Sequence, residues 1–254
     1  VRPYPSTCSG GAEQCARSRH MPPAGQLPRM AKGGRPSAMK YPLVTAALLA
    51  CATPLGAHPH IFVDTGFEVI VDAEGRLTHL RITWAYDEFY SLLVTEDRGL
   101  DPDYDGVLTE AEVASLNGFD MRWIEGFNGD TVLLDGSEEV ALSGPQEVAT
   151  TFSEGRIITS HLRAVEGDAP DANGLVIKPY DPTYYTAYEV TQKVTVQGDD
   201  ACRARVKMPE MNADLRELQQ DLSALDANTD PNDVGLPEIG EALANEVVIT
   251  CDAS

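Results

Sequence analysis

Residues 101–112 read DPDYDGVLTEAE. Acidic side chains stand at the first, third and fifth places, a glycine at the sixth, a hydroxyl at the ninth and a glutamate at the twelfth. This pattern is typical of a calcium-binding loop between two helices, because Ca²⁺ takes roughly six to eight oxygen ligands and the glycine permits a sharp turn. The predicted ligands are Asp101, Asp103, Asp105, the carbonyl of Val107, Thr109 and Glu112.

A plain solvated turn is the competing interpretation of a stretch rich in Asp and Gly. Six constrained positions agree in register here, which favours the calcium loop. Leu108, at the eighth place, is expected to anchor the loop to a core.

The flanking residues predict the two helices of this calcium hand. The entering helix is expected from Asp87 to about residue 99, and the exiting helix from Thr109 to about residue 117. Thr109 with Glu112 three places later also forms the sequence pattern of a capping box. Upstream, residues 61–71 and 77–86 alternate apolar and polar side chains around a turn at 72–75, which predicts a β-hairpin.

The downstream chain consists of short extended segments separated by Gly, Asp and Pro. These segments are 131–134, 147–152, 156–164, 174–180, 186–197 and 202–207. Their spacing favours an antiparallel sheet or sandwich. Helices are predicted at 213–227 and 237–244, followed by a last strand ending at Cys251. The predicted fold is therefore α+β: an antiparallel sheet or sandwich with a calcium hand inserted at about 87–118 and C-terminal helices.

The first 57 residues predict export. Residues 1–38 have little apolar content and are interpreted as a non-native upstream extension. Residues 39–57 have a basic start, an apolar run too short to span a bilayer and a small-residue end, which is the pattern of a cleaved signal peptide. Residues 58–254 would then form a single mature domain. An organelle transit peptide and a lipoprotein signal with a lipid on Cys51 are the open alternatives.

The charge of the mature chain limits its partners. The whole chain has a formal charge of −21. Removing seven basic residues and one acidic residue with the signal leaves 12 Lys and Arg against 39 Asp and Glu, a formal charge of −27. Such a chain repels nucleic acid and anionic membranes and attracts cations. No later segment is long and apolar enough to predict a direct membrane span.

Cys202 and Cys251 are the two cysteines that follow the signal. In an oxidising compartment such a pair predicts a disulfide. A zinc site is the alternative, but the neighbouring sequence offers neither Cys nor His to complete it.

His58 and His60 are the candidate ligands for a transition metal. Alternate residues of an extended strand face the same way about 7 Å apart, so two imidazoles could share an ion. Zinc, nickel and copper are the candidate metals, and Asp64, Asp87 and Glu88 are possible further ligands. The competing interpretation is that both histidines merely follow the cleavage site. His79 and His161 are expected to be half-buried strand residues.

Searches for catalytic patterns find no nucleophile elbow, HExxH helix, phosphate-binding glycine loop or CxxC pair. The expectation is that the chain is not an enzyme.

Several motifs occur together in a characteristic order. They are residues 58–64, 75–77, 84–91, 101–112 and 180–185, followed by Cys202 and Cys251. In this the chain resembles the bacterial proteins filed as domain of unknown function 1007, which are described as periplasmic components of an uncharacterised ABC-type transport system. The resemblance implies a periplasmic location and a role in handling nickel, cobalt or zinc, with a membrane transporter or metal exporter as partner.

Three function classes therefore follow from the sequence. The first is a metal-binding accessory or solute-binding component of a metal ion transport system with a structural calcium site. The second is a secreted interaction module that calcium orders for a protein partner. The third is a copper- or zinc-dependent enzyme that uses the N-terminal histidine.

Overall fold

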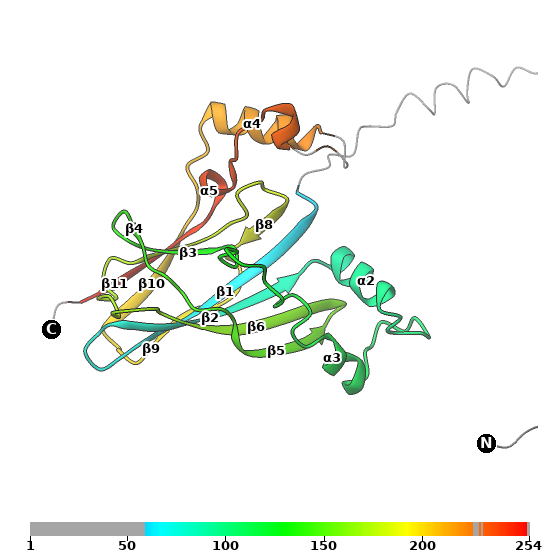
Figure 1. Cartoon of the computed structure of the whole chain (residues 1–254), viewed down its shortest axis with the longest axis horizontal. Coiled ribbons are helices and arrows are strands. Elements are labelled where there is room, and N and C mark those ends of the chain that lie inside the picture. The colour runs from blue at the N-terminus through cyan, green and yellow to red at the C-terminus, as the bar shows by residue number, and fades with distance from the viewer. Residues whose placement is uncertain (1–58, 226–228, 230, 253–254) are drawn as a thin grey trace, which may run out of the picture. The chain divides into compact units, whose positions relative to one another are not determined.

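The computed structural model describes residues 59–225, 229 and 231–252. The predicted upstream extension, the signal peptide, Cys51 and His58 lie outside these residues. Figure 1 shows the elements of the described chain. The strands are β1 (Ile61–Val71), β2 (Leu77–Tyr86), β3 (Thr131–Asp135), β4 (Glu138–Glu139), β5 (Gln146–Ser153), β6 (Arg156–Ala164), β7 (Val176–Pro179), β8 (Thr186–Glu189), β9 (Val194–Gln197), β10 (Cys202–Lys207) and β11 (Glu246–Cys251).

The helices are α2 (Glu88–Asp97), α3 (Glu110–Leu116), α4 (Ala213–Ser223) and α5 (Gly240–Leu243), with a 3₁₀ turn, η1 (Pro231–Val234). α4 is shorter than the helix expected at 213–227, and residues 226–228 lie outside the described chain. α5 begins later than the helix expected at 237–244. No helix in the described ranges is long and apolar enough to cross a bilayer.

The first sheet has the strand order β5-β6-β2-β1-β8, with β9 also paired to β1. β1 and β2 form the predicted antiparallel hairpin, whose turn is tightened by Asp72: its Oδ1 accepts hydrogen bonds from the backbone N–H groups of Glu74 and Arg76. β8 and β9 run parallel to β1, so the first sheet is mixed rather than antiparallel throughout. Parallel pairing needs a long crossover, and here the chain passes through the second sheet before it returns.

The segment expected as one strand at 186–197 is divided into β8 and β9. The chain crosses close to Gly66 of β1 at this break. A Cβ at Gly66 would lie 2.8 Å from Cβ of Gln192 and 3.0 Å from the carbonyl oxygen of Lys193. Glycine therefore permits the close approach that lets two short strands share one edge of β1.

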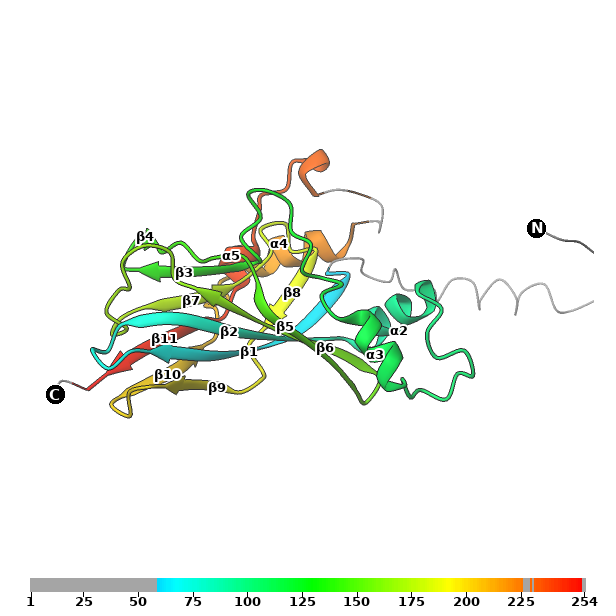
Figure 2. The same cartoon turned by 60° about the horizontal axis from the view of Figure 1, so that its bottom comes forward.

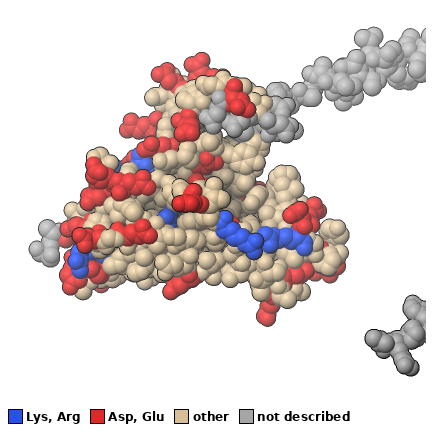
Figure 3. All heavy atoms as spheres, viewed as in Figure 1, with Lys and Arg blue, Asp and Glu red and all other residues tan. Residues whose placement is uncertain are grey.

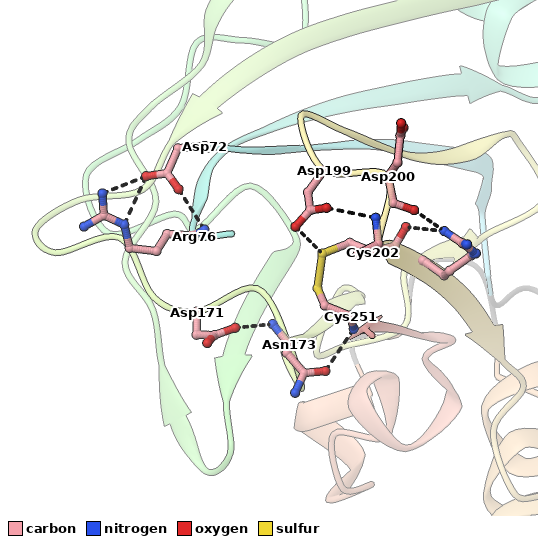
Figure 4. The surroundings of a disulfide bond; sticks show 10 residues. Asp72, Arg76, Asp171, Asn173, Asp199, Asp200, Cys202 and Cys251 are labelled. Atoms are coloured by element: carbon pink, nitrogen blue, oxygen red, sulfur yellow. Dashed lines mark hydrogen bonds and ion pairs between the residues drawn. A yellow bond between two sulfur atoms is a disulfide. The ribbon is translucent and has the colours of Figure 1, made fainter. Parts of the chain in front are cut away.

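The second sheet is antiparallel, with the order β10-β11-β7-β3-β4. Cys202 and Cys251 are opposite each other on β10 and β11 and form the predicted disulfide. Figure 4 shows its surroundings, where the side-chain oxygen of Asn173 accepts a hydrogen bond from the backbone N–H of Cys251 at 3.0 Å. The disulfide and this bond fix the end of the last strand to its neighbours.

The core lies between the two sheets. Figure 2 shows both sheets from a second direction. Alternate residues of β1, among them Val63, Phe67 and Val69, are buried and pack in one cluster with Leu133 of β3 and Ile249 of β11. This alternation is the pattern of a strand with one face toward the core. The mixed α+β class and the predominance of antiparallel strands agree with the sequence-based expectation.

The helices gather in two places. α2 packs on β6 and α3 on β5. α4, α5 and residues beside them form a smaller apolar cluster, centred on Leu215, Leu222 and Ile239. The first pair of helices flanks residues 101–112 and positions the site described next.

Candidate metal centre

Asp87 fixes the start of α2. Its Oδ1 accepts a hydrogen bond from the backbone N–H of Tyr90 at 2.8 Å, which caps the helix. Its Oδ2 accepts one from the backbone N–H of Phe62, also at 2.8 Å, which ties the helix to the beginning of β1. Because both carboxylate oxygens serve the backbone, Asp87 has a structural role in this arrangement.

The loop curls around the carboxylate of Asp101. One oxygen accepts a hydrogen bond from the backbone N–H of Asp105 at 3.1 Å, and the other accepts from Gly106 at 3.0 Å. Gly106 has a φ of 77°, the left-handed conformation that glycine adopts most easily. Asp105 in turn accepts from the backbone N–H of Val107 at 2.8 Å. These bonds bend the chain back on itself.

Three carboxylates meet inside this curl. One oxygen each of Asp101, Asp103 and Asp105 lie within 4.8 Å of one another. Among the described residues this is the one group of three or more His, Cys, Asp or Glu side chains close enough to hold a metal ion together. All of these donors are hard oxygen atoms, a set that fits Ca²⁺ or another hard divalent cation.

Glu112 closes the loop onto its own beginning. Its Oε1 accepts a hydrogen bond from the backbone N–H of Asp101 at 3.0 Å, and its Oε2 accepts from the N–H and hydroxyl of Thr109 at 2.8 and 2.7 Å. These bonds hold the pKa of Glu112 below its usual value, the bond from the Thr109 side chain contributing most. The predicted capping box is present at the start of α3.

A surface cavity of about 480 Å³ lies at the loop and is lined by predicted calcium ligands. Another surface cavity, of about 320 Å³, lies beside the disulfide. Asp103, Asp105, Val107, Thr109 and Glu112 all contribute to the wall of the cavity at the loop. Leu108 is partly buried and packs against the main core, as its place in the loop predicts. The structure therefore brings five of the six predicted calcium residues to one concave surface, and the carboxylate of Asp101 meets those of Asp103 and Asp105.

His60 is placed differently from these residues. Its backbone N–H donates to the carbonyl of Tyr185 at 2.8 Å, and its ring lies 4.5 Å from the ring of Tyr185. Asp64 is engaged by Arg156 at 2.7 Å and by the hydroxyl of Thr191, and these partners hold the pKa of its carboxyl below the usual value against the opposing effect of burial. With His58 outside the described chain, the transition-metal site stays a prediction.

A second group of polar side chains, which the sequence did not bring together, lies where the segment that joins α3 to β3 meets β2 and β6. We call Trp84, Tyr86, Asp120, Thr159 and His161 the buried polar cluster. Asp120 Oδ2 accepts hydrogen bonds from the hydroxyls of Tyr86 at 2.8 Å and Thr159 at 2.7 Å. Burial raises the pKa of the Asp120 carboxyl, although both bonds oppose the shift.

His161 is fully buried, which corrects the expectation that it is half-buried. Its ring lies 4.8 Å from Trp84 and 5.5 Å from Trp123, edge-on to both. Neither ring nitrogen has a hydrogen-bond partner in the described part of the chain, nor do Oδ1 of Asp120 and Nε1 of Trp84. Burial lowers the pKa of His161 to about 3, and the positive charges of Arg163 and Arg81 add to the shift.

Asp130 lies at the end of the same covering segment. Its Oδ2 accepts a hydrogen bond from the hydroxyl of Tyr188 at 2.7 Å. Burial raises the pKa of Asp130 to about 7 despite this bond, with the charge of Asp181 adding to the shift. The alternation of residues 157, 159, 161 and 163 could have placed His161 on the core face. For Asp120 and Asp130, which lie outside regular elements, the sequence carries no such signal.

Fold and site together define a two-sheet α+β protein with a carboxylate-lined loop between two helices. The chain belongs to the family described as "Protein of unknown function (DUF1007)", whose sequence model matches residues 43–251. This match confirms the resemblance that the motifs indicated. No curated protein matches the chain.

Proposed function

We propose that this protein is a periplasmic metal-binding accessory of a metal ion transport system, and that residues 101–112 hold a structural calcium ion. The observation that carries the calcium site is the meeting of the Asp101, Asp103 and Asp105 carboxylates within 4.8 Å. Three like charges at this separation repel one another, and a divalent cation between them removes that cost.

The calcium ion would stabilise the fold rather than act as a sensor. The loop occurs once in the sequence, whereas sensor hands usually work in pairs. Its far end is already joined to its beginning through Glu112 and Asp101, and Leu108 anchors it to the core. An affinity in the range of about 10⁻⁴ to 10⁻³ M would be sufficient outside the cytoplasm.

The transport role is supported by the pattern of export, the acidic composition and the two histidines at the predicted mature N-terminus. An acidic surface raises the local concentration of cations. His58 and His60 would bind zinc, nickel or copper and pass it to a membrane transporter or metal exporter. The ring of His60 is held in place by its contact with Tyr185, which limits the rearrangement that binding requires.

Calorimetric titration of metal-free protein with CaCl₂ tests the calcium site. Asp103 is exposed, and its oxygen is one of the three that meet in the loop, so Asp103→Asn removes a charge with little effect on packing. We expect this variant to bind calcium at least about tenfold more weakly. Asp168→Asn, at an exposed bend outside the loop, is the control and should bind as the wild type does. A wild-type protein without measurable calcium binding at millimolar concentrations would refute the proposal.

A second candidate function is a secreted interaction module that calcium orders for a protein partner. The exposed apolar side chains of α2, the helix that enters the loop, favour it. The two functions are compatible, because an accessory protein must also recognise its transporter.

A further inference from the structure

α2 carries large apolar side chains on its outward face as well as on the face toward the core. Ser91 and Thr95 are its buried residues, and both are small and polar. The hydroxyl oxygen of Ser91 accepts a hydrogen bond from the backbone N–H of Ile157 at 3.0 Å, so this face is joined to β6. A helix on a protein surface usually turns its large apolar side chains toward the core. Tyr90 and Val94 of α2, which are partly buried, do pack against the main core, so this face already anchors the helix.

Three other large apolar side chains of α2 point outward. Phe89, Leu92 and Leu93, spaced three and four residues apart along one side of α2, are 66%, 50% and 47% exposed. Phe62, 50% exposed, is joined to the start of the same helix, because its backbone N–H and carbonyl are both bonded to Asp87. We call these four residues the α2 apolar patch. Single exposed apolar residues are common, but a contiguous group marks an interaction site more often than chance.

The charged side chains around the α2 apolar patch indicate which kind of partner would fit it. Glu88, Glu96 and Asp97 of α2 are exposed beside it, and the acidic loop follows directly. The nearby Arg98 lies over the ring of Phe119, at 5.4 Å from the ring centroid. Figure 3 shows acidic side chains spread over much of one face of the molecule and basic ones confined to a few places. A second acidic copy of the chain or an anionic bilayer would be repelled.

We propose that the α2 apolar patch docks a segment of a partner protein whose apolar side chains are flanked by Lys and Arg. Such a segment would place its apolar face on Phe62, Phe89, Leu92 and Leu93 and its cations on the acidic rim. Aromatic and leucine side chains supply the buried contact, and the charges supply orientation and association rate.

The docking would depend on calcium, and this part rests on the proposed function of the loop. α2 ends at the loop: the backbone N–H of Leu100 bonds to the carbonyl of Thr95 at 2.9 Å, and the first calcium position, Asp101, follows at once. An ion in the loop would fix the direction of α2 and so the arrangement of the patch. Calcium is then an ordering element for recognition.

The test uses a defined probe, a synthetic helical peptide with leucine on one face and lysine on the other. Calorimetry measures its binding to the full mature chain with calcium and with chelator. A peptide with glutamate in place of lysine tests the charge requirement. In the protein, Leu92→Ser with Leu93→Ser removes half of the patch at exposed positions. Val206→Ser with Val234→Ser, at positions 41% and 52% exposed and outside the patch, is the matched control.

We expect the lysine peptide to bind the wild type and the control equally, and the Leu92/Leu93 variant at least about tenfold more weakly. The glutamate peptide should not bind. Equal binding of the lysine peptide to all three proteins, or no binding at all, overturns the proposal. The proposal is also overturned if the wild type forms a dimer or adsorbs to phosphatidylcholine vesicles and the Leu92/Leu93 substitutions abolish that behaviour. If peptide binding needs the α2 apolar patch but persists in chelator, the docking proposal is supported and the proposed ordering role of calcium is refuted.

Discussion

Oε1 of Glu112 accepts a hydrogen bond from the backbone N–H of Asp101 at 3.0 Å, so the last ligand position of the loop is joined to the first. The two ends of residues 101–112 are thereby closed before any ion enters. The fold has therefore already ordered part of the proposed calcium site, and an ion would only have to draw the carboxylates together.

Glu112→Gln and Asp103→Asn should therefore have different effects. Both carboxylate oxygens of Glu112 accept hydrogen bonds, one from Asp101 and the other from Thr109, and Gln has only one acceptor oxygen, so the substitution should weaken calcium binding and lower the melting temperature of the metal-free protein as well. Asp103→Asn should weaken calcium binding and leave the metal-free melting temperature unchanged or slightly raised, since it removes a like charge. Differential scanning calorimetry with calcium and with chelator measures both. Identical metal-free melting temperatures for wild type and Glu112→Gln would contradict this account of Glu112.

Asp130 should make the protein less stable as pH rises from about 4 to about 7. Its pKa is about 7 in the folded chain against 3.8 ordinarily. Between these pH values the unfolded chain has released a proton that the folded chain retains, so raising the pH favours unfolding. The free energy of unfolding falls by at most about 4 kcal/mol over the whole range. Asp130→Asn keeps an acceptor for Tyr188 and suits the positive φ of 47° at this position.

Urea unfolding at pH 5 and pH 8 measures the effect of Asp130→Asn. The variant should gain more stability relative to the wild type at pH 8 than at pH 5. Asp120 has a pKa raised by the same cause and would preserve part of the trend in the variant. An equal difference between the two proteins at both pH values would count against a raised pKa for Asp130.

His161 should produce the opposite dependence. Its pKa falls from 6.5 to about 3 on folding, so below pH 6.5 the unfolded chain binds a proton that the folded chain rejects. Stability is then lost as the pH falls from about 6.5 toward 3, by at most about 5 kcal/mol. NMR should show the His161 ring signals constant between pH 5 and 8, and His161→Phe should reduce the loss of stability in acid. Titration of that ring near pH 6.5 would show that it is not buried as described.

The disulfide should stabilise the fold without determining it. Cys202 and Cys251 are 49 residues apart in sequence, and closing a loop of that length is worth about 2–4 kcal/mol. The β10–β11 ladder from Arg203 to Lys207 remains when the sulfurs are removed. Cys202→Ser with Cys251→Ser should unfold at lower urea concentration and keep the far-ultraviolet circular dichroism spectrum of the wild type. Loss of the folded spectrum in the absence of denaturant would show that the disulfide is essential.

The transition-metal site should be separable from the calcium loop. Titration of the mature protein with Zn²⁺, Ni²⁺ and Cu²⁺ should show one site that His58→Ala with His60→Ala removes and Asp103→Asn leaves intact. The imidazoles and the loop carboxylates bind ions of different hardness, so the two variants should each affect one class of metal. Unchanged binding in the double histidine variant would exclude these residues as the ligands.

Local regularities of the sequence determined several features of this protein. Fixed spacing along twelve residues predicts the proposed calcium loop, and the same spacing predicts the capping box at Thr109 and Glu112 that the structure contains. Alternation determined the hairpin of β1 and β2, and the pairing of Cys202 with Cys251 followed from there being no other cysteine after the predicted cleavage site. In each case the residues are related by the geometry of a short stretch of chain or, for the cysteines, by the lack of another cysteine after the predicted cleavage site.

Tertiary structure alone decided the rest, because it depends on which distant segments meet. The parallel pairing of β8 and β9 with β1 needs a long crossover through the second sheet, which local periodicity does not encode. The burial of Asp120, Asp130 and His161 arises where the segment before β3 covers the first sheet, and burial is what shifts their pKa values. The outward face of α2 was likewise hidden in the sequence, since apolar side chains occur both on that face and on the face that packs against the core.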